Sequence, residues 1–394
     1  DVDDKGQEGL ELAYNNWLEG QAGLKQVIKD RLGHVVADIR AIRPPKPGHD
    51  LQISLDKRIQ YVAYRELKAA GERYRADSGS VVVLDVKTGE ILAMVNWPSY
   101  NPNHRRSAQD GHARNRAVTD LFEPGSTIKS FSMASVLSNS QFTPSSQIDT
   151  SPGWMIIAGK RITDERNNGV MDLTKILQIS SNMGMSKLIL SQPAENLWNT
   201  LHRVGFGQVT ESNFPGERTG SLPHFKVWNP FVLATLSFGY GISVTTLQLA
   251  QAYAVLAQGG VKVPVTFLKV EGDAPLGQSV MGQRISREIL AMLESVLSKG
   301  GTAPLARVPG YRVTGKTGTV RIVGAHGYEK HHYNSIFIGI APASQPRLVV
   351  AVILHDPKGQ FYYGGYTAGP IFSHVMSNTV HLLNIAPDDV ANLN

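Results

Sequence analysis

Strand-forming and helix-forming segments occupy different parts of this 394-residue chain, and this separation restricts the possible folds more than any other feature. Two apolar, β-rich runs, Ser80–Asp85 and Glu90–Val95, flank a turn at Lys87–Gly89, which predicts a hairpin. Three further strand-like runs lie near the C-terminus: Tyr311–Val323, Tyr333–Ile340 and Leu348–Leu354. The region between these two groups is mainly helical in pattern. We therefore expect an α+β fold with one sheet built from both ends of the chain, rather than alternating βαβ units.

Helical periodicity is clearest in three segments. The run Asp56–Ala70 carries its apolar side chains on one stripe: Ile59, Val62, Ala63 and Leu67. Thr245 and Gln248 have the spacing of a capping box that begins a helix, and Gly259–Gly260 would end that helix. A last helix is expected at about Ile371–Leu383.

The first 48 residues form a separate segment in sequence pattern. Gly9–Glu19 has helical spacing, and Gln26–Ile39 has the pattern of a hairpin that turns near Gly33. The proline-rich run Pro44–Gly48 interrupts regular structure and is the best linker candidate. We therefore predict a small N-terminal segment at residues 1–48 and one large domain at residues 49–394.

The composition excludes several classes of function. The chain has no cysteine, so disulfides, thiolate metal sites and cysteine nucleophiles are excluded. Its net charge of +6 is scattered, and the chain has no zinc-knuckle spacing, so we expect no binding to nucleic acid. No stretch reaches the roughly 18 apolar residues of a membrane span. The chain begins at Asp1 rather than Met and shows no signal peptide, so we expect a trimmed form of a longer protein.

Ser126 and Lys129 form an S-x-x-K element, the first pattern that points to chemistry. A largely apolar helix is expected to begin at about Ser126, just after Pro124-Gly125. Burial in such a helix would lower the pKa of Lys129, and the neutral amine could then take a proton from the serine one turn away. The helix N-terminus would also direct backbone N–H groups at an anion formed there. S-x-x-K often occurs by chance, so the pattern alone favours a helix-capping serine beside an exposed lysine.

Two further polar elements follow. In Ser180–Asn182 a hydroxyl could relay a proton and an amide could hold a peptide carbonyl, although a capping or turn cluster is the favoured explanation of these residues taken alone. In Gly315–Thr319 the glycines would let another backbone approach a strand closely, and the lysine and threonines would form a carboxylate-binding edge. Such an edge could pair with an extended peptide, or could simply be a polar edge strand.

The three elements occur in the order S-x-x-K, S-x-N and K-T-G, which is the serine signature of β-lactamases and penicillin-binding proteins. With its flanking motifs the chain resembles the class B, high-molecular-weight penicillin-binding proteins, most closely the division-specific transpeptidases of the penicillin-binding protein 3 type. The likeness covers about residues 50 to 385. The flanking motifs that carry it are Tyr100–Asn103, Arg114–Arg116, Phe122–Lys129 (F-E-P-G-S-T-x-K), Phe238–Gly241 with Thr245, Gln248 and Ala250, and Tyr362–Gly365.

This resemblance implies the transpeptidase and serine β-lactamase-like fold, a five-stranded antiparallel sheet flanked by helices. Residues 1–48 would be the remnant of a non-catalytic pedestal with its linker, and residues 49–394 the transpeptidase domain. The four implied catalytic residues are the nucleophile Ser126, the base Lys129, and the relay pair Ser180 and Lys316. The implied substrate-binding residues are Asn182, Thr317, Gly318, Thr319, Arg321, Tyr333, Tyr362 and Tyr363. The backbone N–H groups of Ser126 and Thr319 would form the oxyanion hole.

The same resemblance implies D,D-transpeptidation of peptidoglycan stem peptides at the division septum, from a lipid-linked precursor, with covalent inhibition by β-lactams. It implies a place at the periplasmic face of the bacterial inner membrane, an N-terminal anchoring helix outside this chain, and a septal glycosyltransferase and other division proteins as partners. No cofactor and no metal are expected. His331-His332 is too weak a metal signal, because adjacent strand residues point to opposite faces.

Three related activities remain as alternatives: a class D-like β-lactamase, a penicillin-sensing domain, and a D-alanyl carboxypeptidase. A β-lactamase needs a base for deacylation, and no Glu-x-x-Leu-Asn run follows Ser180–Asn182. The chain has no G-x-S-x-G elbow, which argues against an α/β-hydrolase.

Overall fold

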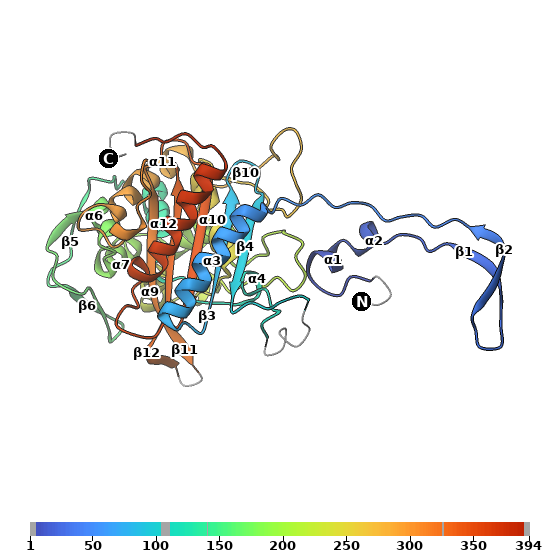
Figure 1. The fold of residues 1–394 in the computed structure, drawn as a ribbon. Helices are drawn as coiled ribbons and strands as arrows, with labels where there is room; N and C mark the ends of the chain where they lie inside the picture. Colours follow the sequence, from blue (N-terminus) through green and yellow to red (C-terminus); the bar gives the residue numbers. More distant parts are fainter. Residues whose placement is uncertain (1–4, 104–110, 140, 325–326, 390–394) are drawn as a thin grey trace. The chain divides into compact units, whose positions relative to one another are not determined.

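The computed structural model describes residues 5–103, 111–139, 141–324 and 327–389 (Figure 1). The chain divides into two compact units. The first contains residues 1–53 and 213–217, and the second contains residues 54–212 and 218–394. Within the described ranges, no helix combines the length and the apolar character needed to cross a bilayer.

The first unit consists of two short helices and a hairpin. The helical run expected at residues 9–19 is broken at Tyr14 into α1 (Gly9–Ala13) and α2 (Asn15–Leu18). Strands β1 (Leu24–Lys29) and β2 (Val35–Arg43) form the predicted hairpin, and Gly33 in its turn has φ of +87°. The proline-rich run after β2 is irregular except for a bridge between its lysine and residue 21.

The second unit is built on the predicted five-stranded antiparallel sheet. Its strand order is β11-β12-β13-β3-β4, so strands from both ends of the chain meet at the β13–β3 pair. The strand bounds are β3 Ser78–Asp85, β4 Ile91–Trp97, β11 Thr314–Gly324, β12 Gly327–Ala341 and β13 Leu348–His355. Strand β3 is buried along its whole length and β13 along all but its last residue, because helices cover both faces of the sheet there; β13 is apolar up to His355, and β3 carries an apolar run at its centre, residues 81–84. The predicted fold class is confirmed.

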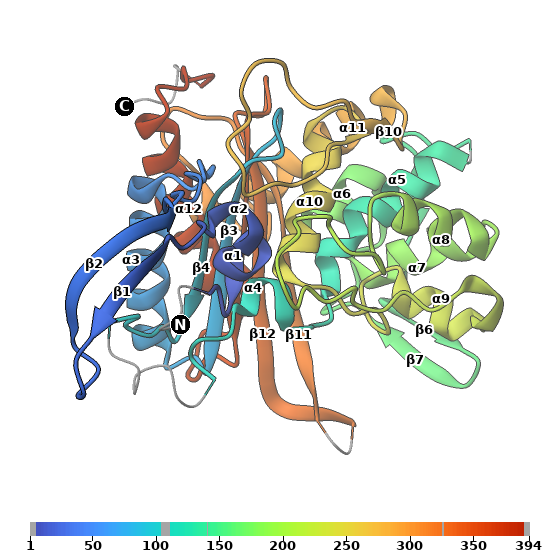
Figure 2. The same ribbon diagram turned by 90° about the vertical axis from the view of Figure 1, so that its right-hand side faces the viewer.

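Helices lie on both faces of the sheet (Figure 2). Helices α3 (Lys57–Tyr74) and α12 (Gly364–Leu382) pack on one face, and α10 (Thr246–Ala257) packs on the other against β13 and β3. The capping box predicted at the start of α10 is present: Gln248 N donates to Thr245 Oγ1 (3.1 Å), and Thr245 N donates to Gln248 Oε1 (2.8 Å). The capping box therefore fixes the first turn of α10, next to the sheet.

Helix α12 begins earlier than the sequence indicates. It was expected from about Ile371, but it starts at Gly364 and continues through Pro370. The two glycines that resemble a loop instead form the first turn of the helix, packed against the sheet. A Cβ on Gly364 would lie 2.2 Å from the carbonyl oxygen of Ile336, so only glycine permits this contact.

The remaining elements lie mostly in the middle of the chain and form a helical lobe beside the sheet (Figure 2). Two small hairpin-like pairs, β5–β8 and β6–β7, border this lobe, and β9–β10 pair near α11. The helix bounds are α4 Arg116–Thr119, α5 Lys129–Asn139, α6 Leu173–Gln178, α7 Asn182–Leu190, α8 Ala194–Arg203, α9 Pro230–Leu236 and α11 Gln283–Glu294. The short strands are β5 Gln147–Asp149, β6 Trp154–Ile157, β7 Lys160–Thr163, β8 Val170–Asp172, β9 Val261–Lys262 and β10 Gln278–Ser279.

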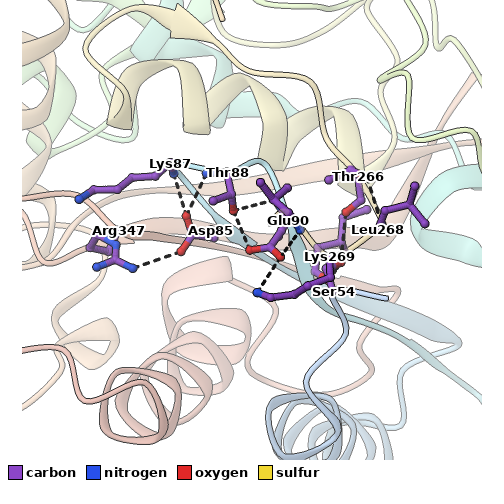
Figure 3. Close-up of polar contacts among 11 residues, drawn as sticks. Ser54, Asp85, Lys87, Thr88, Glu90, Thr266, Leu268, Lys269 and Arg347 are labelled. Atoms are coloured by element: carbon purple, nitrogen blue, oxygen red, sulfur yellow. Dashed lines mark hydrogen bonds and ion pairs between the residues drawn. The ribbon is translucent and has the colours of Figure 1, made fainter. Parts of the chain in front are cut away.

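A polar network fixes the turn of the β3–β4 hairpin to the segment after α10 (Figure 3). Glu90 is almost fully buried and accepts hydrogen bonds from Lys269 Nζ (2.8 Å), the backbone N–H of Val270 (3.0 Å) and Thr88 Oγ1 (2.9 Å). Ser54 adds a bond to the carbonyl of Ile91 (2.8 Å). Burial by itself would raise the pKa of Glu90, but these hydrogen bonds outweigh it and hold the pKa below its ordinary value.

We expect Glu90→Ala to lower the free energy of unfolding by about 2 kcal/mol, because several donors lose a charged acceptor at a buried position. Urea denaturation followed by circular dichroism measures this change. The matched control is Arg284→Ala, which removes an exposed helical ion pair with Glu288 and should cost less than about 1 kcal/mol.

The contribution of Glu90 should also depend on pH. Its lowered pKa makes the stabilisation complete above the unfolded value of about 4.3, and the stabilisation is lost as the pH falls through the folded value. The stability gap between the parent and Glu90→Gln should therefore shrink in acid. A gap that widened below pH 4 would contradict this assignment.

Candidate active site

Ser126 lies on a tight turn at the start of the buried helix α5. The turn is a 3-10 helix, Gly125–Ile128, and the α-helix proper begins at Lys129, one turn later than the sequence indicates. Tyr253 of α10 supports the turn from beneath, because its hydroxyl donates to the carbonyl of Thr127 (2.8 Å). Ser126 is half-buried, and its Oγ makes no hydrogen bond within the described part of the chain. The hydroxyl is thus held on a rigid turn but can still rotate.

Lys129 is completely buried, as its apolar helix predicts. Its Nζ donates to the carbonyl of Ser180 (2.5 Å), to Ser180 Oγ (3.2 Å) and to Asn182 Oδ1 (2.7 Å). Burial lowers the pKa of Lys129 to about 7, and the negative charge of Asp164 opposes that shift. Near neutral pH a large fraction of this amine is therefore uncharged and able to accept a proton.

Lys316 of β11 approaches the same hydroxyl from the sheet. It is completely buried, and its Nζ donates to Ser180 Oγ at 3.0 Å. Burial, with the nearby charge of Lys129 as a second cause, lowers the pKa of Lys316 well below its ordinary value. Ser180 Oγ thus bridges the two amines, and the residue adopts a left-handed φ of +61° to do so. Lys129, Ser180, Asn182 and Lys316 are called the lysine cluster below.

Asp164 lies next to the lysine cluster, and the sequence pattern did not predict it. Its Oδ2 accepts from Ser181 Oγ (2.5 Å), and its Oδ1 accepts from the backbone N–H groups of Asn182 (2.6 Å) and Met183 (3.0 Å). The carboxylate therefore occupies the N-terminus of α7, where the helix dipole favours negative charge. The residue comes from the loop after β7, and nothing in the local sequence relates it to an element 17 residues later.

The K-T-G element lies on β11, which is an edge strand of the sheet. Thr317 is buried and its hydroxyl contacts that of Thr302 (2.8 Å), while Thr319 Oγ1 accepts from the backbone N–H of Gly364 (3.0 Å). Gly318 faces the nucleophile turn, and a Cβ there would lie 2.9 Å from the carbonyl oxygen of Pro124. The glycine therefore allows the strand to approach the Ser126 turn closely, as the sequence pattern indicates.

Of the four remaining predicted residues, Arg321 and Tyr333 lie further along β11 and β12, and the other two lie just before α12. Arg321 is exposed on β11 and pairs in register with Tyr333 of β12. The ring of Tyr333 stacks on Tyr362 (centroids 4.2 Å apart), which stacks on Tyr363 (4.6 Å). These three tyrosines form a continuous stack of rings, called the aromatic ladder below. The hydroxyl of Tyr363 donates to Glu165 Oε1 (3.5 Å).

Across the described residues, no group of three or more histidine, aspartate and glutamate side chains is arranged to hold a metal ion. His332, one of the two adjacent histidines singled out in the sequence, contacts Asp356 Oδ2 through its Nδ1 at 2.6 Å. The half-buried serine and the two buried amines around it support acid–base and nucleophilic chemistry. A partly neutral Lys129 one turn from Ser126 is suited to accept the serine proton.

Comparison with known proteins identifies two conserved domains. Residues 79–377 match the penicillin-binding protein transpeptidase domain, and residues 2–53 match the penicillin-binding protein dimerisation domain. The chain is 43% identical over 391 residues to the probable peptidoglycan D,D-transpeptidase PbpC of Pseudomonas aeruginosa. That match covers 99% of this chain and 69% of PbpC. The chain is also 41% identical over 387 residues to the peptidoglycan D,D-transpeptidase FtsI of Escherichia coli K12, covering 98% of this chain and 65% of that protein.

A solved structure agrees with these matches. The apo transpeptidase domain of penicillin-binding protein 3 from Burkholderia pseudomallei superimposes with a TM-score of 0.79 at 39% identity, over 87% of this chain and 99% of that one. The chain therefore belongs to the penicillin-binding protein transpeptidase family, and the prediction from its motifs is confirmed. It spans about two thirds of the length of the PbpC and FtsI relatives.

The contacts of Asp164 generate a prediction for stability. Asp164→Ala should lower the free energy of unfolding by about 2–4 kcal/mol, because the N-terminus of α7 loses three charge-assisted hydrogen bonds. The matched control is Asp172→Ala, which removes one capping bond to Lys175 N at the start of α6 and should cost about 1 kcal/mol. Equal losses in the two variants, measured by urea denaturation, would show that Asp164 is only an ordinary cap.

Proposed function

We propose that this chain is a peptidoglycan D,D-transpeptidase that acts through an acyl-enzyme on Ser126. The observation that carries the proposal is the convergence of Lys129 and Lys316, both buried, on the hydroxyl of Ser180, with Lys129 three residues after the half-buried Ser126. The names of the relatives agree with this activity. Since the chain covers only part of those proteins, the activity, substrates and partners of the whole protein belong to this proposal.

In the acylation half-reaction Ser126 Oγ attacks the carbonyl carbon of the penultimate D-alanine of a donor stem peptide. Lys129, in its neutral form, takes the serine proton as the C–O bond forms. The backbone N–H groups of Ser126 and Thr319 stabilise the oxyanion of the tetrahedral intermediate. When the C–N bond breaks, a proton passes through Ser180 and Lys316 to the leaving amine, and D-alanine departs.

The substrate is bound by the residues around this centre. Asn182 holds the peptide backbone through its amide, and the hydroxyls of Thr317 and Thr319, with the edge strand at Gly318, hold the terminal carboxylate and pair with the extended peptide. Arg321 adds positive charge for that carboxylate. The aromatic ladder of Tyr333, Tyr362 and Tyr363 forms an apolar wall beside the peptide.

The second half-reaction transfers the acyl group to an amine of an acceptor stem peptide. The amine nitrogen attacks the ester carbonyl and gives a proton to the lysine cluster. The cluster returns a proton to Ser126 Oγ as the C–O bond breaks, which leaves the new amide bond and the free serine. β-Lactams present a strained amide to the same serine and would be trapped as the acyl-enzyme. A β-lactamase activity is not favoured, since the relatives are named as transpeptidases.

The wider biological setting rests on family resemblance. We infer a role at the division septum, with lipid-linked precursor as the source of substrate and a septal glycosyltransferase and other division proteins as partners. We also infer a place on the periplasmic face of the inner membrane, with attachment through an N-terminal helix. Residues 1–48 are proposed to be the pedestal and linker part, and residues 49–394 the transpeptidase domain.

The nucleophile can be tested by mass. Incubation with benzylpenicillin should add the mass of one intact drug molecule, because the ring opens without losing an atom. The adduct should be absent from Ser126→Ala and present in Ser145→Ala, a control at an exposed serine. Intact-mass spectrometry measures both. No adduct on the parent at saturating drug would refute the proposal, and rapid return to unmodified mass would instead favour a β-lactamase.

The role of Lys129 can be tested by pH. Because burial lowers its pKa to about 7, the acylation rate should rise with pH and reach half its maximum near pH 7. Lys129→Ala should slow acylation by about 10²-fold or more and remove this pH dependence. Lys299→Ala, at an exposed position, is the matched control. Stopped-flow acylation with a chromogenic cephalosporin gives the profile, and a wild-type profile in Lys129→Ala would exclude this base.

A further inference from the structure

A hollow lies beside the sheet, apart from the lysine cluster. It is a cavity of about 300 Å³, and none of its lining residues belongs to the proposed catalytic or substrate-binding set. Its floor is formed by the start of β3 and the end of β13, and its wall by the chain around α4 and by Arg218. The floor residues are Ser78, Gly79, Ser80, Ile353 and His355.

Strand register gives the position of this cavity relative to the K-T-G strand. Ser80 pairs with Ile353, which pairs with Ile336, which in turn pairs with Gly318 on β11. Directly paired residues project from the same face of a sheet, so the Ser80 side chain shares the face of Lys316, two residues from Gly318. Three strand spacings separate the two places, which is about 14 Å. The cavity is therefore a separate place on the same face of the sheet.

Positive charge dominates the wall of the cavity. Arg114, Arg116 and Arg218 line it together with a single carboxylate, Asp120. Asp120 is shared: Arg114 Nε lies 3.0 Å from its Oδ1, and Arg116 Nη1 lies 3.0 Å from its Oδ2. Three guanidinium groups therefore face one carboxylate, which leaves the wall two positive charges in excess.

Part of this donor capacity is unused. The Arg116 side chain is only 15% exposed, yet its Nε is buried with no hydrogen-bond partner among the described residues. Arg218 is exposed, and its guanidinium makes no hydrogen bond within the described ranges, so its donors are free for a ligand in the cavity that it lines. The Arg116 Nε is itself inaccessible, so Arg116 contributes mainly its positive charge.

We propose that this cavity binds an oxyanion, a carboxylate or a phosphate, through the guanidinium of Arg218, with Arg114 and Arg116 adding positive charge. Guanidinium groups match both anions because their forked N–H donors fit two oxygens at once. Resting on the proposed function, the first source of such a group is a carboxylate of a peptidoglycan stem peptide. A free inorganic anion is the second source of the same chemistry.

The cavity also lies on the chain that leads to the nucleophile. Leu121 and Phe122 line it, and Phe122 pairs with Val244 at the bridge just before the Ser126 turn. An anion bound there would contact a segment only four residues from Ser126. A stem peptide held by its carboxylate would therefore be retained near the reaction without occupying the lysine cluster.

The test is a calorimetric titration of the Ser126→Ala chain at low ionic strength. This variant cannot be acylated, so the result can be read whether or not the proposed transpeptidase activity holds. Three probes are used: inorganic phosphate, a stem tetrapeptide with free carboxylates, and the same peptide with its carboxyl groups amidated. Each is also titrated into the chain carrying Arg218→Glu in addition, and into one carrying Arg284→Glu in addition. Arg284 is an exposed control on α11 with the same change in net charge.

Arg218→Glu should weaken binding at least tenfold, the scale expected for a lost charge-assisted hydrogen bond, while Arg284→Glu should not. Binding of the free peptide but not of phosphate or the amidated peptide would support the stem-peptide source. Binding of phosphate alone would support the free anion. No binding of either anionic probe, or an equal loss in both variants, would overturn the proposal. An unchanged melting temperature in Arg218→Glu confirms that folding is intact.

Discussion

The site depends on one physical constraint: two lysine side chains are buried around a single hydroxyl, Ser180 Oγ. Burial in low dielectric lowers the pKa of both amines, and the nearby charge of Lys129 lowers the pKa of Lys316 further. The protein retains them by supplying acceptors, the Ser180 carbonyl and Asn182 Oδ1, and one carboxylate, Asp164. The result is an amine with a pKa of about 7 in place of a permanent cation. That shift is what makes proton transfer from serine feasible at neutral pH.

The two-part architecture follows from this constraint. One lysine comes from the helical lobe, on α5, and the other from the sheet, on β11, so the chemistry exists only where the two layers meet. Each lysine is held in position by a separate contact. Tyr253 supports the turn before Lys129, and Gly318 allows β11, which carries the other lysine, to approach that turn closely. Val320 extends this contact, because its side chain fills the space beside Gly125. Rigid supports of this kind hold catalytic groups to the precision that a reaction needs.

Much of this arrangement could be predicted from the sequence, for reasons that can be named. Short stretches of sequence determine turns, caps and helical faces. The β3–β4 hairpin, the capping box of α10 and the buried helix after Ser126 were therefore predicted correctly. Contacts between segments that are distant in the sequence produce no local sequence pattern from which they could be predicted. Asp164 was missed because its partners lie on another element, and the start of α12 was misplaced because paired glycines usually indicate a loop. In both cases the tertiary contact, rather than the local preference, decides the structure.

The same reasoning explains why the arginine-lined cavity is informative. In the lysine cluster every buried donor has an acceptor, as a completed site requires. Around α4 the balance differs, since Asp120 is divided between two guanidinium groups and Arg116 keeps an unpartnered Nε among the described residues. An anion bound by Arg218 would balance the positive charge around this cavity that Asp120 alone does not neutralise.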